Sequence, residues 1–460
     1  MNRDRDTIAA ISTPPGTGGI GIIRLSGPMA LGVLQKIFQP RNDACPFVSH
    51  HLYYGHLVDP ASGKTLDEVL AVYMRAPATY TREDVVEIHC HGSFLVLRAI
   101  LELILMFPVS LARPGEFTKR AFLNGRIDLT KAEAVIDILS ARTQRGVELA
   151  VDQLSGTLHR RIEAIRSALT TMRAVVEVAI DFPDEDVEIL DHEQLLDQLR
   201  QEVKTPLEEL VAGADQGRLV REGVSVVIAG LPNVGKSSLL NTLLQEERAL
   251  VTAVPGTTRD TIEEVIDIRG LPVRLIDTAG IRDQAGEVEE LGIMRAKEQI
   301  DRADLILFMI DASVGFTDAD RELFQLIGSK QVILVENKMD LQPQSISYPE
   351  PVESGPPKQK ISAKQCLGIG RLKEMIFELV TGGEGQLKEE GCAPNIRHKD
   401  SLVRALSACQ RIKHGLELRQ TSDLVAIDLQ ECLDQLGEII GVTTTEDILD
   451  VIFDQFCLGK

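Results

Sequence analysis

The octapeptide Gly230-Leu-Pro-Asn-Val-Gly-Lys-Ser237 follows an apolar run, Val224–Ala229, and precedes a segment with the pattern of a helix. Strand, Gly-x-x-x-x-Gly-Lys-Ser and helix together form the context of a phosphate-binding loop. The two glycines let backbone N–H groups surround phosphate oxygens, and the helix N-terminus adds a positive dipole end. Lys236 supplies a cation for the β- and γ-phosphates, and Ser237 supplies a hydroxyl for Mg²⁺. A glycine turn without a ligand is the alternative, but the companion motifs favour nucleotide binding.

Four short motifs follow this loop in the order that a GTPase requires. They are Gly256-Thr-Thr-Arg-Asp260, Asp277-Thr-Ala-Gly280, Asn337-Lys-Met-Asp340 and Ser362-Ala-Lys364. The carboxylate of Asp340 can accept both N–H donors on the Watson–Crick edge of guanine, a donor pair that adenine lacks. We therefore expect GTP, with Mg²⁺ held partly through Asp277. Ile281 stands where Ras-type enzymes carry their water-orienting glutamine, so another group must position the water.

The hydrophobic pattern predicts a multidomain chain. Residues 1–118 mix short strands with one helix and indicate an α+β domain with a mixed sheet. Residues 218–383 alternate strands and helices, as in a doubly wound α/β domain. Residues 119–217 and 384–460 are helical, so the α/β domain is predicted to be inserted between two halves of an all-α domain.

Composition limits the function classes. The chain has 460 residues, 44% hydrophobic and 26% charged, with a formal net charge of −20. Such a charge excludes nucleic-acid binding through overall electrostatics, so RNA must meet a local basic patch or a partner protein. The seven cysteines show no zinc-like spacing, and this favours a reducing, cytoplasmic setting. No apolar run approaches 18 residues, so no membrane span is expected.

Some motifs outside the GTPase pattern have two interpretations each. His89-Cys-His91 suggests a metal site, but a structural or substrate-facing role is favoured because no third ligand lies nearby in the sequence. The segment Arg113–Leu129 mixes charged and aromatic residues and reads, at its simplest, as a solvated linker. From about residue 131 to 176 the chain is predicted to be helical, and a second helix is expected over about 192–214. Thr443-Thr-Thr-Glu446 predicts a capping box for the last helix.

One apolar seam marks the first of these helical stretches as part of a bundle. Its residues recur at spacings of three and four, as expected for a core face rather than a cofactor site. They are Leu154, Leu158, Ile162, Ile165, Leu169, Met172 and Val176.

The run Arg113-Pro-Gly-Glu-Phe-Thr-Lys-Arg-Ala-Phe-Leu-Asn124, the inserted GTPase motifs and the terminal Cys457-Leu-Gly-Lys460 resemble the MnmE (TrmE) family of tRNA-modification GTPases over the whole chain. The resemblance implies a homodimer that works with the FAD-binding partner MnmG (GidA). Together they would place an aminomethyl or carboxymethylaminomethyl group on C5 of the wobble uridine of certain tRNAs. The one-carbon donor would be a tetrahydrofolate derivative, 5-formyl- or methylene-tetrahydrofolate, bound by the N-terminal domain.

The resemblance also assigns residues. Folate contacts fall on Arg24, Glu87, Arg126 and Lys460. A K⁺ ion held by Asn233, Thr252, Thr257 and the carbonyl of Val254 would replace an arginine finger. Mg²⁺ would be held by Ser237 and Thr258. The catalytic group comprises Lys236, Glu289 as the water-positioning carboxylate, and Cys457. The nucleotide set is Asn233, Val234, Gly235, Lys236, Ser237, Ser238, Thr252, Ala253, Val254, Pro255, Gly256, Thr257, Thr258, Asp277, Thr278, Ala279, Gly280, Asn337, Lys338, Asp340, Ser362, Ala363 and Lys364.

Two questions stay open on the sequence alone. Cys457 is either a small buried hydrophobe or a reactive thiol beside the terminal Lys460. The main alternative to tRNA modification is a regulatory GTPase of RNA or ribosome assembly. Such a protein usually carries a basic RNA-binding module, whereas this chain ends in acidic helices. A third possibility is a structural dimer that uses GTP only to stay folded.

Overall fold

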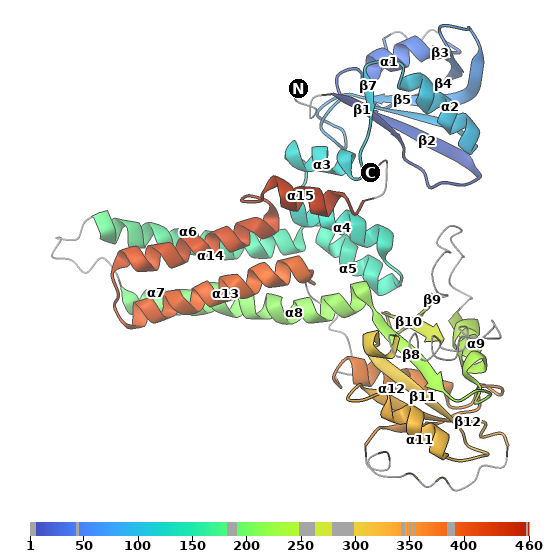
Figure 1. Ribbon diagram of the computed structural model, residues 1–460. Helices are drawn as coiled ribbons and strands as arrows, with labels where there is room; N and C mark the ends of the chain where they lie inside the picture. The colour runs from blue at the N-terminus through green and yellow to red at the C-terminus, as the bar shows by residue number, and fades with distance from the viewer. Residues whose placement is uncertain are drawn as a thin grey trace. The chain divides into compact units, whose positions relative to one another are not determined.

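The computed structural model describes residues 6–42, 46–181, 191–247, 263–277, 299–341, 346, 348, 352, 355–383, 392–456 and 459. The chain divides into two compact units (Figure 1). The first combines Met1–Leu139, Gln153–Pro206 and Ser401–Lys460, and the second combines Ser140–Asp152 and Leu207–Asp400. Each unit therefore joins segments that are distant in the sequence.

The first unit contains a mixed sheet of seven strands. They are β1 (Thr7–Ile11), β2 (Gly18–Ser26), β3 (Phe38–Pro40), β4 (His51–Val58), β5 (Thr65–Met74), β6 (Val85–Gly92) and β7 (Val109–Leu111). Their order is β3-β4-β5-β6-β2-β1-β7, and only the β1–β7 pair is parallel. This arrangement confirms the predicted α+β class.

One face of this sheet is covered by α1 (Ala30–Ile37) and α2 (Phe94–Ile104). A Cβ added to Gly21 would lie 2.4 Å from Leu97 Cδ1, so the glycine lets α2 approach the sheet closely. Successive side chains of β2 and β6 point to opposite faces of the sheet, and this core receives Ile23, Leu25, Val86 and Ile88. The other face of the sheet therefore receives Arg24, Glu87 and His89.

The segment that follows the sheet, for which a solvated linker was the simplest interpretation, is packed into the fold. It forms α3 (Glu116–Leu123), in which Phe117 and Arg120 are buried. Arg120 donates to the carbonyl of Asp6 (2.7 Å) and pairs with Glu83 (3.2 Å) and Glu116 (2.9 Å). A buried guanidinium needs such partners, because an unpaired one would carry a large desolvation cost.

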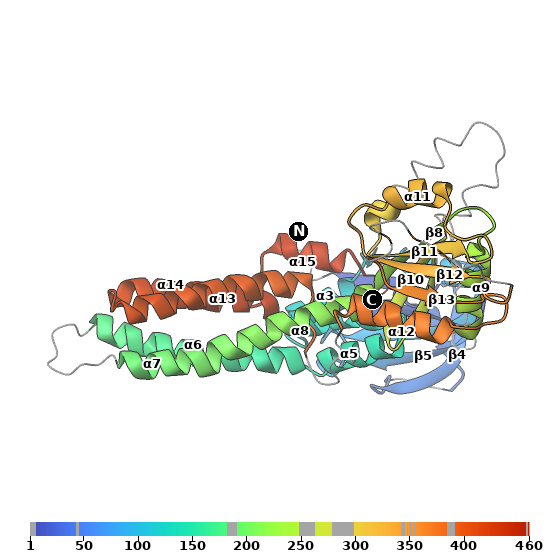
Figure 2. The same cartoon turned by 90° about the horizontal axis from the view of Figure 1, so that it is seen from below.

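Among the helices of the first unit, α6 (Thr157–Asp181), α7 (His192–Gln198), α13 (Ile396–Glu417) and α14 (Ser422–Ile440) lie side by side as a bundle (Figures 1 and 2). The unit also contains α4 (Leu129–Ser140) and α15 (Glu446–Phe453). The predicted seam is confirmed from Leu158 to Val176, where the apolar residues of α6 are buried and α6 packs against α14. Its first residue, Leu154, instead ends the preceding helix and is only half-buried. The helical stretch expected over residues 131–176 is three helices rather than one, because α5 (Gln144–Leu154) separates α4 from α6.

The second predicted helix, expected over about 192–214, is interrupted in the structure. Residues Leu199–Lys204 form a π-helical stretch between α7 and α8 (Thr205–Glu222).

The predicted capping box at Thr443–Glu446 is wrong: the N-cap is Thr445, which makes no side-chain capping bond. The hydroxyl of Thr443 donates to the carbonyl of Asp434 instead, at 3.1 Å. Among the described residues, no helix has both the length and the apolar character needed to cross a membrane.

The second unit contains a six-stranded sheet. Its strands are β8 (Val224–Gly230), β9 (Glu263–Ile268), β10 (Leu271–Asp277), β11 (Leu305–Asp311), β12 (Val332–Asn337) and β13 (Lys358–Lys360). The order is β13-β12-β11-β8-β10-β9, parallel except for the β9–β10 hairpin. Two core clusters lie on its two faces, one with α9 (Lys236–Glu247) and α12 (Ile369–Val380), the other beside α11 (Asp318–Gln325). The predicted α/β class is confirmed.

Candidate functional site

The loop between β8 and α9 is shaped by its glycines. Gly230 has φ +150°, and a Cβ there would lie 2.4 Å from the Met309 carbonyl oxygen. Gly235 has φ +103°, and its Cβ would lie 2.2 Å from Asn337 Nδ2. Asn233 has φ 63°, a left-handed conformation that asparagine tolerates better than most residues. The loop thus bends tightly at the carboxyl end of β8, and α9 begins directly after it.

The Lys236 ammonium folds back over this loop. Its Nζ donates to the carbonyls of Gly230 (3.0 Å) and Leu231 (2.9 Å). Ser237 and Ser238 occupy the first turn of α9, where the helix dipole favours an anion. The cation and the helix terminus therefore lie next to the same concave stretch of backbone.

Asn337 connects the phosphate loop to a second loop. Its Nδ2 donates to the Val234 carbonyl (2.8 Å), and its Oδ1 accepts from the Ala363 N–H (3.0 Å). The side chain is 3% exposed, so both of these hydrogen bonds are buried. The sequence placed Asn337 among nucleotide contacts, and the structure adds this bridging role, which sequence reasoning missed.

Asp340 and Ser362 are also brought together. The Ser362 hydroxyl donates to Asp340 Oδ1 at 2.6 Å. This bond, with lesser help from Lys364 and Lys338, holds the pKa of the Asp340 carboxyl below its usual value. Lys338 has φ 68°, and its Nζ pairs with Asp311 at 2.6 Å. An ionised carboxylate at this position is the form that accepts two N–H groups of guanine.

Part of the predicted site lies outside the described residues. This applies to Thr252, Ala253, Val254, Pro255, Gly256, Thr257, Thr258, Thr278, Ala279, Gly280, Glu289, Cys457 and Lys460. Asp277 ends β10, whose register with β8 brings that strand end beside Ile228. The Asp277 side chain is not among the described atoms.

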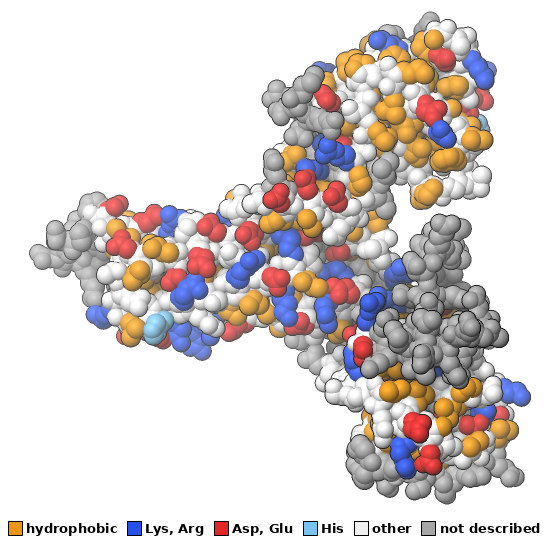
Figure 3. All heavy atoms as spheres, in the orientation of Figure 1, with side chains coloured by type: hydrophobic (Ala, Val, Ile, Leu, Met, Phe, Trp, Pro, Cys, Tyr) orange, Lys and Arg blue, Asp and Glu red, His pale blue; other side chains and the backbone are white. Residues whose placement is uncertain are grey.

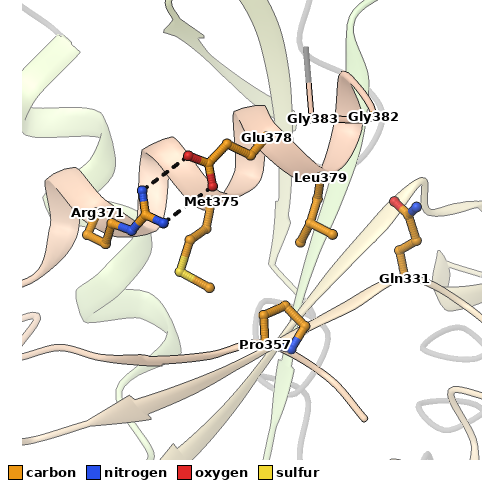
Figure 4. A pocket seen from close by; sticks show the side chains of 8 residues that line it. All are labelled: Gln331, Pro357, Arg371, Met375, Glu378, Leu379, Gly382 and Gly383. Atoms are coloured by element: carbon orange, nitrogen blue, oxygen red, sulfur yellow. Dashed lines mark hydrogen bonds and ion pairs between the residues drawn. The ribbon is translucent and has the colours of Figure 1, made fainter. Parts of the chain in front are cut away.

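A hollow elsewhere in this unit does not belong to the nucleotide loops (Figure 4). It lies between α12 and the residues that precede β12 and β13, and its lining includes Gln331, Pro357, Arg371, Met375 and Leu379. Arg371 pairs there with Glu378, its neighbour on α12. The strands begin on this side, whereas ligands of such sheets bind where the strands end.

The predicted folate residues of the first unit are partly brought together. Arg24 and Glu87 are direct register partners on β2 and β6, and their side chains pair at 2.8 Å. The Arg24 guanidinium lies 5.7 Å from the Phe117 ring centroid. Arg126 contacts Tyr80, with its guanidinium 4.8 Å from the ring centroid and Nη1 donating to the Tyr80 carbonyl.

A single small core cluster underlies both arginines. It contains Ile8, Ala10, Ala112 and Phe117, with Tyr80 packed against it. The sequence carried no local signal for this link, because Tyr80 and Phe117 are far apart along the chain.

The histidines of β6 have different partners. His91 Nδ1 bonds to Asp67 (2.7 Å), and this hydrogen bond raises the pKa of His91. His89 Nε2 lies 3.6 Å from Glu87 Oε2, and Cys90 faces the core. In the part of the chain that the structure describes, no group of three His, Cys, Asp or Glu side chains is placed to hold a metal ion.

The second unit therefore has the fold and loop chemistry of a P-loop GTPase. The loop after β8, the α9 terminus, and the Asn337, Asp340 and Ser362 loops all follow the carboxyl ends of strands, where a doubly wound sheet binds its ligand.

Comparison with known proteins shows which family the whole chain resembles. Residues 129–457 match the model described as "MnmE helical domain", and residues 7–126 match "GTP-binding protein TrmE N-terminus". The tRNA modification GTPase MnmE of Desulfotalea psychrophila is 59% identical over 99% of both chains. That of Geobacter sulfurreducens is 48% identical, also over 99% of both chains. The chain belongs to the MnmE family of tRNA modification GTPases.

Among solved structures, the G domain of the T. maritima FeoB iron transporter is 28% identical and covers 34% of this chain and 97% of its own, with a TM-score of 0.26. That similarity adds nothing to the family assignment.

Proposed function

We propose that this GTPase depends on K⁺ and acts as a homodimer in the cytoplasm. With the FAD-binding partner MnmG (GidA), it modifies C5 of the wobble uridine of tRNA, adding an aminomethyl or carboxymethylaminomethyl group. The one-carbon unit comes from 5-formyl- or methylene-tetrahydrofolate. Membership of the family supports the GTP and tRNA parts of this proposal. The face that Figure 3 shows intersperses Lys and Arg with Asp and Glu along the helices, which agrees with tRNA being held mainly through the complex.

In the proposed GTP site each residue has one task. Lys236 and the α9 terminus neutralise the phosphates, while Ser237 and Thr258 hold Mg²⁺. Asn233, Thr252, Thr257 and the Val254 carbonyl hold K⁺, and Glu289 orients the attacking water. Asn233 lies in this loop in a left-handed conformation, which asparagine tolerates better than most residues, and this supports its part. K⁺ supplies a positive charge where negative charge develops in the transition state.

In the proposed folate site, Arg24 and Arg126 face the anionic glutamate tail together with Lys460, and Glu87 accepts N–H groups of the pterin. Cys457 provides a thiol at the same site. The observation that carries this part is the Arg24–Glu87 pair. Its side chains are only about one-fifth exposed, and they lie on the sheet face that α1 and α2 do not cover.

The domain roles form part of the proposal. Residues 1–118 bind folate and form the dimer, 218–383 are the G domain, and 119–217 with 384–460 are the helical domain. Contacts group 140–152 and 207–400 together, so α5 and most of α8 accompany the G domain as one unit.

The proposal is tested by titrating 5-formyl-tetrahydrofolate into the full chain in a calorimeter. The intact protein should bind, and Glu87→Ala should bind much more weakly. Glu68→Ala is the matched control, because Glu68 lies exposed on neighbouring β5 with a single long contact to His56. Deleting 457–460 should abolish wobble-uridine modification, measured by mass analysis of tRNA, while GTP hydrolysis continues. No folate binding by the intact protein would refute the folate part.

A further inference from the structure

Glu87 is held from one side by Arg24. The guanidinium donates from Nε to Glu87 Oε1 at 2.8 Å, and its Nη2 forms an ion pair with the same oxygen at 2.8 Å. The second oxygen, Oε2, faces His89, which lies two residues along β6 and therefore on the same face of the sheet. The three side chains are about equally shielded, with 19–23% of their surface exposed.

The His89 side chain has an unsatisfied nitrogen. Its Nε2 is inaccessible to solvent and has no hydrogen-bond partner among the described residues. The register partners of His89 are Ile22 on β2 and Leu70 on β5, which are both apolar. Glu87 Oε2 lies 3.6 Å from this nitrogen, just beyond hydrogen-bond length. A buried polar atom without a partner is unfavourable, so a shift of less than an ångström towards Glu87 is favoured.

We propose that His89 is a positioning residue for Glu87, whose carboxylate binds the ligand. This role rests on the proposed folate function. Arg24 fixes Oε1, and after this small shift the His89 N–H bonds to Oε2, so the plane of the carboxylate is set from both ends. A carboxylate has about four acceptor positions. Two remain for adjacent N–H groups, the arrangement that the 2-amino and ring N–H of a pterin present. His89 itself acts through Glu87 and not on the ligand.

The test compares two amide replacements of His89. In His89→Gln the side-chain amide reaches the position of Nε2, whereas in His89→Asn it reaches only that of Nδ1. Both variants remain polar and should fold equally well, which thermal unfolding checks. Calorimetry with 5-formyl-tetrahydrofolate should show near-normal binding by His89→Gln. A hydrogen bond to a charged group is lost in His89→Asn, so its Kd should rise about tenfold. His91→Asn is the control, because His91 bonds to Asp67 rather than to Glu87.

A double-mutant cycle then separates positioning from general structure. With Glu87→Gln in place, His89→Asn should change Kd by about twofold or less, because the carboxylate that it supports is gone. A full tenfold loss in that background, or equal affinities of the Gln and Asn variants, would overturn the role of His89. If the intact protein binds no folate, the proposed function fails first, and the positioning role fails with it.

Discussion

Gly459 lies against the backbone of Ile11. A Cβ built on Gly459 would stand 2.3 Å from the Ile11 carbonyl oxygen and 2.9 Å from the Cα of Ser12. Gly459 also has φ +92°, a conformation that other residues rarely adopt. Ile11 pairs with Ile23 on β2, the neighbour of Arg24. The penultimate residue of the chain is therefore packed against the sheet that carries the Arg24–Glu87 pair.

Replacing Gly459 by alanine should displace the C-terminal end from β1. Both the contact with Ile11 and the positive φ oppose a side chain, so we expect weaker folate binding and loss of tRNA modification. GTP hydrolysis should continue. Gly370→Ala is the control, since nothing lies within 4 Å of a Cβ at that helical position. Equal folate affinity of Gly459→Ala and the intact protein would contradict the importance of this contact.

Asn337→Ala should loosen the nucleotide loops. It leaves the Val234 carbonyl and the Ala363 N–H buried without partners, at a cost of about 1–3 kcal/mol in unfolding free energy for each group left unsatisfied. GTP affinity should fall as well, because the two loops lose their link. Denaturant unfolding and nucleotide titration measure the two effects. Gln365→Ala, at an exposed position of the same loop, should change neither.

The affinity for GTP should depend on pH through Asp340. The Ser362 hydrogen bond lowers the pKa of this carboxyl below 3.8, so the guanine-binding, ionised form persists as the pH falls through the ordinary aspartate range. Ser362→Ala removes that donor and raises the pKa, so its affinity should begin to fall at a higher pH. Titration of a fluorescent GTP analogue between about pH 3 and pH 6, a range that spans the usual aspartate pKa of about 3.9, measures the difference. Coincident profiles would exclude this coupling.

Asp340→Asn should also change nucleotide choice. Asparagine presents a donor where guanine also donates, whereas xanthine presents an acceptor there. We expect weak GTP binding and new binding of xanthine nucleotides, measured by competition. An unchanged preference for GTP would show that this loop does not contact the base.

GTP hydrolysis should require K⁺ and fail in Na⁺ at equal ionic strength. Asn233→Ala should remove the response to K⁺, because a proposed ligand is lost while the glycines that shape the loop remain. Hydrolysis rates in matched KCl and NaCl solutions provide the measurement. Equal rates of the intact protein in both salts would contradict K⁺ dependence.

Glu289→Ala should slow hydrolysis and leave GTP affinity nearly unchanged. A water-positioning group acts in the transition state, and its loss typically costs about 10²–10⁴ in rate. Single-turnover hydrolysis and equilibrium binding separate the two quantities. Normal turnover would reassign the role, and Glu287→Ala would then be the variant to compare.

The local sequence was sufficient to predict those elements whose key residues lie close together in the chain. The phosphate loop between β8 and α9 was predictable because the positive φ values of Gly230 and Gly235 are local requirements, and Lys236 bonds to carbonyls within the same loop. The buried seam of α6 was predictable because its spacing of three and four residues reports burial directly. The capping box failed because α15 begins after Thr445, two residues later than a box starting at Thr443 requires, and a motif of four residues does not by itself fix where the helix starts.

Only the tertiary structure decided the contacts between distant segments. The burial of Arg120 depends on Asp6 and Glu83, and the tie between the nucleotide loops depends on Asn337 meeting Val234 and Ala363. Likewise, the orientation of Glu87 follows from a register that sets it opposite Arg24. Hydrogen bonds and close packing act over a few ångströms in space, whatever the separation in sequence. The sequence by itself determined which chemical groups are available, and the fold determined which of them meet.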